Sequence, residues 1–304
     1  MNKGILYILL SGLCFMFVNI FVKVLSLGPA QSIFTDIQKY PIPEIVLFRS
    51  IISFVMSYII IKKRGLPIFG VNKKWLLIRG IFGTIALTTF FYTLDHLPIA
   101  VATTVQYLSP LFTVVIAIFL LKETVKPIQW LFFGIAFLGV FTIGISKFIE
   151  KSDGLAVINP WWVLAGIGSA VSAGVAYNAI VKCKATDQPI NIVIYFPMVA
   201  IPIMSVLCFF EFVLPIGKEW FILLIIGVFT QFAQLLMTKA LHEEATATVT
   251  PFKYFGSIYA VFVGMFLFGE FISIYAYIGI TLILSGVLGN TLMRKRKRRV
   301  SSTF

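Results

Sequence analysis

The sequence has little charge and few cysteines, and both shortages restrict what the chain is. Charged residues make up 12% of the 304 residues and hydrophobic residues 59%, whereas a soluble domain carries about 25% charged residues. The three cysteines, Cys14, Cys183 and Cys208, are odd in number and scattered, so they predict neither a disulfide framework nor a metal site. The composition excludes a water-soluble protein and indicates one polytopic membrane domain, because lipid is the solvent that accepts so much apolar surface.

Catalytic motifs are missing as well. An intramembrane enzyme would need a reactive constellation such as HExxH, GxSxG or paired acids in the middle of apolar segments, and the sequence has none of these. The two histidines, His96 and His242, lie at expected short turns. We therefore expect a protein that is not an enzyme and that needs no cofactor or metal.

Long apolar runs predict ten transmembrane helices, at residues 4–27, 44–61, 75–94, 98–121, 128–146, 161–181, 190–213, 219–241, 245–268 and 272–293. Their connections carry an uneven share of Lys and Arg. Placing the N-terminus in the cytoplasm puts sixteen of these residues on the inner side and four on the outer side. By the positive-inside rule both termini are expected in the cytoplasm, with the protein in a bacterial inner membrane.

Two stretches of the chain repeat each other. Sliding the sequence by 147 positions superposes residues 94–140 on 241–287 with ten identities over 47 positions, among them Tyr107 on Tyr254 and Gly139 on Gly286. Each half holds five expected spans, an odd number, so the second half enters the membrane upside down. The predicted fold is an all-α polytopic membrane protein with ten transmembrane helices in two inverted five-helix repeats. Its expected domains are 1–148, 160–293 and a basic cytoplasmic tail, 294–304.

Three phrases resemble the EamA-type branch of the drug/metabolite transporter superfamily. They are LFRSIIS around Arg49, the long run LLIRGIFGTIALTTFFYTLDHLPIAVATTVQYLSPLFT from Leu76, and TPFKYFGSIYAVFVGMFLFGE from Thr250 to Glu270. The resemblance covers nearly the whole chain. It implies ten spans in two inverted halves and the export or exchange of small metabolites, and it leaves the substrate open because the family's substrates vary widely.

A lysine in the expected ninth span is the leading candidate for a substrate-binding residue. Lys253 lies about 12 Å along that span at the helical rise, and its repeat counterpart is Gln106. Each is followed by a tyrosine, Tyr107 or Tyr254, which we expect to shape the walls of one central cavity. The alternative is that Lys253 bonds backbone carbonyls or a neighbouring amide.

Two arginines and three uncharged polar residues complete the candidate set. Arg49 and Arg79 lie near the ends of their spans. Three roles are open for each of them: lining the cavity, snorkelling to the headgroups, or a structural role such as pairing with Glu44. In the resembled family the FR and RG phrases recur at these places, which implies that one of the two arginines lines the cavity. Asn19, Gln231 and Gln234 either hydrogen-bond substrate or join helices.

No carboxylate lies in the middle of an expected span, so the interior is expected to be electropositive and to repel cations. Glu123 and Glu270, at equivalent span ends, are expected to staple the bundle, with gating as the alternative. The predicted function is a secondary transporter, an exporter or exchanger, of a small anionic or zwitterionic metabolite by alternating access. A lipid-translocating or scaffolding membrane protein is the alternative. The basic tail is expected to bind anionic lipid and not nucleic acid; monomer and homodimer stay open.

Overall fold

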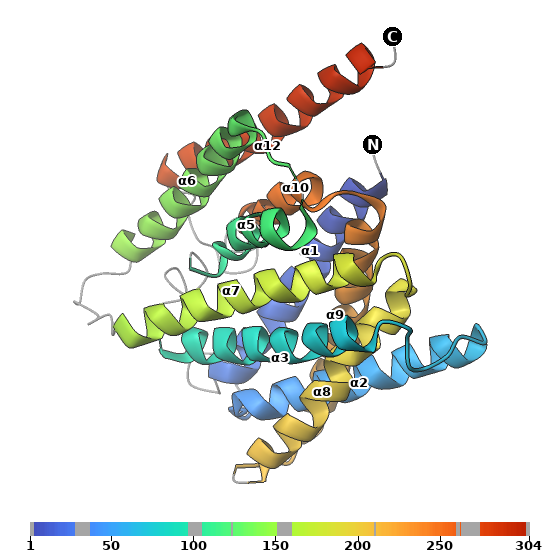
Figure 1. Cartoon of the computed structure of the whole chain (residues 1–304). Helices are drawn as coiled ribbons and strands as arrows, with labels where there is room; N and C mark the ends of the chain where they lie inside the picture. Colours follow the sequence, from blue (N-terminus) through green and yellow to red (C-terminus); the bar gives the residue numbers. More distant parts are fainter. Residues whose placement is uncertain are drawn as a thin grey trace.

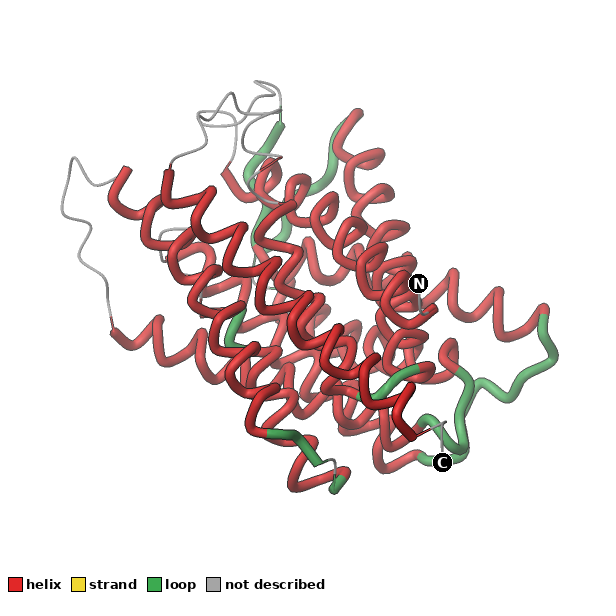
Figure 2. Tube along the Cα trace, turned by 90° about the horizontal axis from the view of Figure 1, so that it is seen from above, coloured by secondary structure: helices red, strands yellow, loops and turns green. Residues whose placement is uncertain are grey.

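The chain is all-helical wherever its structure is described. The computed structural model describes residues 3–27, 37–96, 105–122, 124–150, 160–209, 211–259, 262 and 274–301. Helices are the regular secondary structure of these ranges, and they are bundled side by side (Figure 1). In Figure 2 both ends of the chain lie on the same side of the bundle. The expected fold class, an all-α polytopic membrane protein, is confirmed.

Six helices of the described residues are long and apolar enough to cross a membrane. They are α1 (Lys3–Leu27), α2 (Ile42–Lys63), α3 (Lys73–His96), α7 (Pro160–Cys183), α8 (Pro189–Cys208) and α9 (Lys218–Glu243). Shorter apolar stretches form α5 (Ser109–Leu121) and parts of α6 (Pro127–Glu150) and α12 (Ile274–Ser301). These helices follow the expected spans in order, because long runs without charge pair their backbone groups internally in lipid.

The expected fourth and ninth spans differ from this pattern, because neither is a single regular helix. In the fourth, a tight turn closes with the Leu108 N–H donating to the Val105 carbonyl at 3.0 Å, and α5 begins after it. In the ninth, α10 (Thr246–Val249) passes into a 3₁₀ segment, η1 (Thr250–Tyr254). A proline lies beside each irregularity, Pro110 or Pro251, and removes a helical N–H donor. The irregular turns fall at equivalent places in the two repeats.

The crossing of α6 and α12 shows the relation between the two halves. A Cβ on Gly139 would lie 2.5 Å from the Gly279 carbonyl, and a Cβ on Gly286 would lie 2.6 Å from the Phe132 carbonyl. Gly286 and Gly279 stand 147 positions after Gly139 and Phe132, so one contact is the image of the other. From Phe132 to Gly139 the residue numbers of α6 rise, while those of the contacted residues on α12 fall from Gly286 to Gly279. The two helices are therefore antiparallel. The two halves are therefore related by a two-fold axis that inverts one against the other.

The same two-fold relation governs the central helices. The most extensive contacts of α3 are with α7, and those of α1 are with α9. Because α9 is the repeat counterpart of α3 and α7 that of α1, the two helix pairs are images of each other. Gly80 of α3 brings that helix against α8, where an added Cβ would lie 2.6 Å from the Tyr195 carbonyl. Gly227, its counterpart on α9, faces α2, where an added Cβ would lie 2.5 Å from Ile52. Small residues at both places let the backbones approach closely.

A buried glutamate at the start of α9 fastens the connection that leads into α2. Glu219 accepts hydrogen bonds from the Tyr40 hydroxyl at 2.5 Å, the Gln38 N–H at 2.7 Å, the Gln38 side-chain amide at 3.1 Å and the Ile216 N–H at 2.7 Å. We call this group the Glu219 latch. Burial, followed by the hydrogen bond to Glu219, raises the pKa of the Tyr40 phenol above its ordinary value. The described part of the long connection before α2 is thus held against the bundle.

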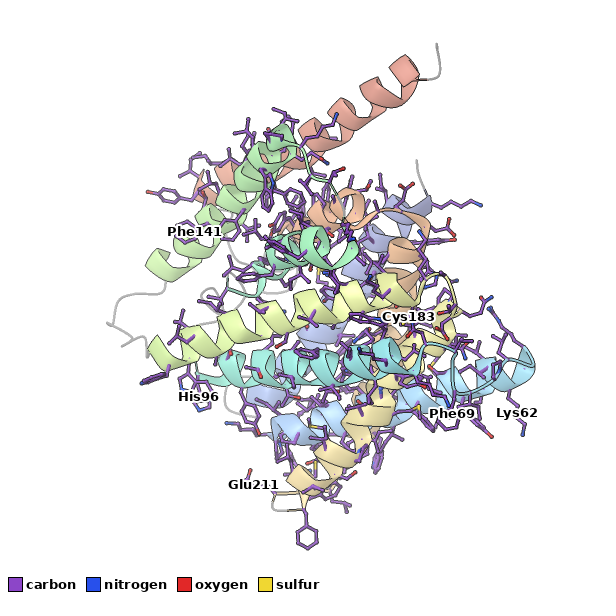
Figure 3. The ribbon with its side chains drawn as sticks, in the orientation of Figure 1. Lys62, Phe69, His96, Phe141, Cys183 and Glu211 are labelled. Atoms are coloured by element: carbon purple, nitrogen blue, oxygen red, sulfur yellow. The ribbon has the colours of Figure 1, made fainter. Side chains whose placement is uncertain are left out.

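A second carboxylate forms the corresponding fastening at the other end of α8. Asp187 accepts hydrogen bonds from the N–H groups of Val71, at 2.5 Å, and Asn72, at 3.1 Å. Asp187 is the repeat counterpart of Tyr40, and Asn72 is the counterpart of Glu219. We call this group the Asp187 latch; it joins the same two repeat positions as the Glu219 latch. The carboxylate lies at the position of Glu219 in one latch and at the position equivalent to Tyr40 in the other. The 20 residues of α8 separate the two latches by about 30 Å. In Figure 3, Lys62 and Phe69 mark the end of the bundle opposite His96.

Candidate functional site

Arg49 lies in the first half of α2 and is almost completely buried, with 1% of its surface exposed. Its guanidinium carbon lies 5.9 Å from the ring centre of Phe91 on α3 and 5.9 Å from that of Phe196 on α8. Its Nε and Nη2 atoms have no hydrogen-bond partner among the described residues. A permanently charged group is therefore held between aromatic rings with donors unused.

In the described residues Arg49 neither pairs with Glu44 nor snorkels to the headgroups. Glu44 accepts a hydrogen bond from the Val213 N–H at 2.9 Å and makes no ion pair with Arg49 in the described part of the chain. Snorkelling would bring the guanidinium to the surface, whereas Arg49 is buried. Glu44 instead fastens the connection between α8 and α9 to the start of α2.

Arg79 approaches the same aromatic ring from α3. Its guanidinium carbon lies 5.7 Å from the centre of Phe196, and 2% of the residue is exposed. Nη2 donates to the Gln234 side-chain oxygen at 2.6 Å, while Nε is buried and finds no partner in the ranges that the structure describes. Gln234 on α9 therefore orients Arg79 without neutralising it.

Lys253 lies in η1, the 3₁₀ turn of the ninth span. Its Nζ atom lies 3.2 Å from the ring centre of Tyr177 on α7, and the residue keeps part of its surface accessible. Arg79 is within electrostatic reach of both Lys253 and Tyr177. The alternative role of Lys253 is a hydrogen bond to a backbone carbonyl or a neighbouring amide. Lys253 makes no such bond within the described ranges. We call Arg49, Arg79 and Lys253 the basic cluster.

The expected companions of Lys253 lie around the same irregular turns. The Ser169 hydroxyl lies 3.1 Å from the Gln106 side-chain oxygen. The rings of Tyr107 and Tyr254 stand 6.4 Å apart at 57°, and the Tyr254 hydroxyl is buried without a partner. Tyr107 keeps accessible surface, whereas Tyr254 is fully buried.

Two of these contacts join residues that are repeat counterparts of each other. Phe196 stands 147 positions after Arg49, and Tyr254 stands 147 positions after Tyr107. A residue that touches its own counterpart lies beside the two-fold axis. In an inverted repeat that axis lies in the plane of the membrane at its middle depth. Arg49 and the turn that carries Lys253 are thereby assigned to the middle of the bundle.

The remaining polar candidates are placed differently from one another. Gln231 accepts from the Ser53 hydroxyl at 2.5 Å and donates to the Ser57 oxygen at 2.8 Å, so it joins α9 to α2. Gln234 is bound to Arg79 in the basic cluster. Asn19 is exposed on α1 and makes no side-chain hydrogen bond with the described residues. Gln234 is thus the one of these three that touches a cation.

The energetics of the basic cluster favour an anion. Taking a charged group out of water costs several kcal/mol, and each buried donor left unused adds about 1–3 kcal/mol. A cation–π contact returns only about 0.5–2 kcal/mol, so the rings around Arg49 do not offset the cost. In the part of the chain that the structure describes, no carboxylate pairs with any of the three cations. A carboxylate or phosphate would supply the missing partner.

Two residues of this neighbourhood are not foreseen from the sequence. Phe196 could have been found as the repeat counterpart of Arg49, whereas no such signal in the sequence points to Tyr177. Glu123 and Glu270, the expected staples, lie outside the described residues. Among the described residues, no group of three His, Cys, Asp or Glu side chains is placed to hold a metal ion.

Known proteins similar to this chain are transporters. The pseudopaline exporter CntI of Pseudomonas aeruginosa PAO1 is 29% identical over 261 residues, which are 85% of each chain. A riboflavin transporter of Rhizobium johnstonii is 25% identical over 299 residues, covering 97% of this chain and 93% of that protein. Human solute carrier family 35 member G1 is 29% identical over 269 residues, covering 84% of this chain and 70% of that protein.

The fold and the family agree with these relatives. A solved crystal structure aligns with a TM-score of 0.78 at 18% identity, over 96% of this chain and 98% of that chain, which supports the fold alone. The EamA-like transporter family matches residues 2–145 and again residues 160–292. This double match spans both halves of the bundle, and the chain therefore belongs to the EamA-like transporter family, as a multi-pass integral membrane protein that transports a small molecule.

Proposed function

We propose that this protein is a secondary transporter, an exporter or exchanger, of a small anionic or zwitterionic metabolite, and that it works by alternating access. The single observation that carries the proposal is the basic cluster, three cations in the interior without a carboxylate partner in the described residues. Such a group binds an acid more readily than a cation. Arg49, Arg79 and Lys253 are the proposed substrate contacts, with Gln106, Tyr107, Tyr254, Asn19, Gln231 and Gln234 around them.

The inverted halves support the alternating-access part of the proposal. Carriers built from inverted repeats hold substrate near the middle of the membrane, at irregular helix turns, and expose it by rocking one part against another. The turns at Leu108 and in η1 are irregular backbone of this kind. We assign residues 1–148 and 160–293 to the two repeats and residues 294–304 to a cytoplasmic tail that binds anionic lipid.

Orientation and location follow from the charge bias of the connections. The excess of Lys and Arg on the side of the termini favours a cytoplasmic position for both ends, in a bacterial inner membrane. The relatives named as exporter and transporter support a small-molecule cargo. Their named substrates are not assigned to this chain.

A ligand screen of the purified protein tests the charge of the substrate. Thermal stabilisation is measured with short carboxylates, amino acids, nucleotides and quaternary ammonium cations, each at constant ionic strength. Acids or zwitterions are expected to stabilise the protein, and Lys253→Gln is expected to weaken that effect. Lys239→Gln is the matched control, because Lys239 also lies over an aromatic ring, 5.8 Å from the centre of Tyr7, which contacts none of the three cations in the described residues. Stabilisation by the cations alone would refute the proposal.

A lipid-translocating protein is the rival function, and a vesicle assay separates the two. Proteoliposomes with a fluorescent phospholipid in both leaflets are treated with an impermeant quencher. The proposed carrier is expected to leave the inner leaflet protected, as in vesicles without protein. Complete quenching would favour the rival.

A further inference from the structure

The basic cluster holds more positive charge than one acid group neutralises. Arg49 and Arg79 both contact the ring of Phe196, at 5.9 Å and 5.7 Å from its centre, whereas Lys253 contacts a different ring, that of Tyr177. A single carboxylate forms one forked pair with a guanidinium. It would leave the other cations in a medium of low dielectric, where like charges repel strongly.

The three cations also differ in access and in the half of the chain that supplies them. Both arginines come from the first repeat and are 1% and 2% exposed, whereas Lys253 comes from the second repeat and keeps accessible surface. Gln234 binds Arg79 and leaves its Nε unused, and Arg49 has two unused nitrogens. The cations thus fall into two groups, a pair of buried arginines from the first repeat and one lysine from the second repeat.

Resting on the proposed function, we infer that the substrate is an acid with at least two anionic groups, one held by Arg49 and Arg79 and the other by Lys253. Phe196 contacts the two arginines and Tyr177 contacts Lys253, so an aromatic ring lies at each binding point and favours a carbon chain or a ring in the substrate. Gln234 is a positioning residue, because it acts through Arg79. A dicarboxylic acid, or an acid that also carries a phosphate, satisfies both points at once.

Matched acids of equal chain length test this inference directly. Binding of butyrate is compared with binding of succinate, and valerate with glutarate, by titration calorimetry of the full-length protein in lipid nanodiscs at constant ionic strength. Each dicarboxylate is expected to bind about tenfold more tightly than its monocarboxylate, which is about 1.4 kcal/mol. Equal affinities in wild-type protein overturn the inference and leave the proposed function standing. Binding of quaternary ammonium ions without binding of any acid overturns both.

Variants separate the second binding point from a general loss of charge. Lys253→Gln is expected to lower the affinity for succinate to that for butyrate. Lys253→Arg keeps the charge and is expected to keep the preference. Lys239→Gln removes a cation over a ring elsewhere and is expected to change neither affinity. A Lys253→Gln protein that still prefers succinate tenfold would overturn the role of Lys253.

Discussion

Replacing Glu219 by glutamine should open the latch between the start of α9 and the connection that leads into α2. The carboxylate accepts four hydrogen bonds, one at Oε1 and three at Oε2. Glutamine keeps one oxygen and turns an NH2 group toward a donor. With the oxygen at the Oε2 position, the amide would face the Gln38 N–H, which donates to Glu219 at 2.7 Å.

The expected loss of stability follows from these four contacts. A hydrogen bond to a charged group contributes about 1.5–3 kcal/mol, and a neutral one about 0.5–1.5 kcal/mol. Losing one bond outright and weakening the other three sums to about 4–7 kcal/mol. Burying a neutral amide costs less than burying a carboxylate, which offsets part of this loss, so a net cost of about 2–4 kcal/mol is expected. The Gln38 N–H is only part-buried and can turn to water, so the lower part of this range is expected.

Thiol labelling during a thermal ramp measures the change, because Cys183 and Cys208 are buried in the folded protein. Glu219→Gln is expected to expose them at a lower temperature than wild type. Glu211→Gln is the control, since Glu211 lies in the connection between α8 and α9, eight residues before Glu219, and is exposed. Equal midpoints for Glu219→Gln and Glu211→Gln would refute the energetic role assigned to the latch.

Three further predictions concern other contacts of the fold. Asp187→Asn should destabilise the protein by about 1–3 kcal/mol, because one oxygen is lost from a carboxylate that binds two backbone N–H groups; thermal unfolding beside Glu219→Gln measures it. Gly139→Leu should cost about 1–3 kcal/mol or more through overpacking on α12, whereas Gly134→Leu on the same helix should not, because nothing lies within 4 Å of it. Stability should fall as pH rises past about 10, because the folded protein holds the Tyr40 phenol protonated while the unfolded chain releases the proton. Tyr40→Phe should reduce this slope, and an unchanged slope would contradict it.

The order and type of the helices could be predicted from the sequence because lipid imposes one requirement on every span. Apolar runs of about 20 residues must pair their backbone groups internally, so length and hydropathy identify α1, α2 and α3 closely. The same rule fails at Leu108 and in η1, where prolines and tertiary contacts produce tight turns inside apolar runs. Hydropathy does not distinguish a regular helix from a 3₁₀ turn of the same composition.

The candidate site was predictable in its charges and not in its aromatic contacts. Burying a cation is costly wherever it occurs in a span, so Arg49, Arg79 and Lys253 stand out on the sequence alone. The rings that flank them do not, because Phe196 and Tyr177 belong to a chain with 31 phenylalanines and 11 tyrosines. Which aromatic side chain faces a cation is decided by helix packing, which composition does not encode.

The contact of Arg49 with its own repeat counterpart has a consequence for duplicated carriers. On a two-fold axis, two copies of one position face each other, so an arginine in both copies would set like charges together in a nonpolar surrounding. Phe196 at that place resolves the conflict. A duplicated carrier must therefore differ between its halves where a charge lies on the axis, whereas uncharged counterparts such as Tyr107 and Tyr254 can stay identical there. A cargo held beside Arg49 encounters two different walls.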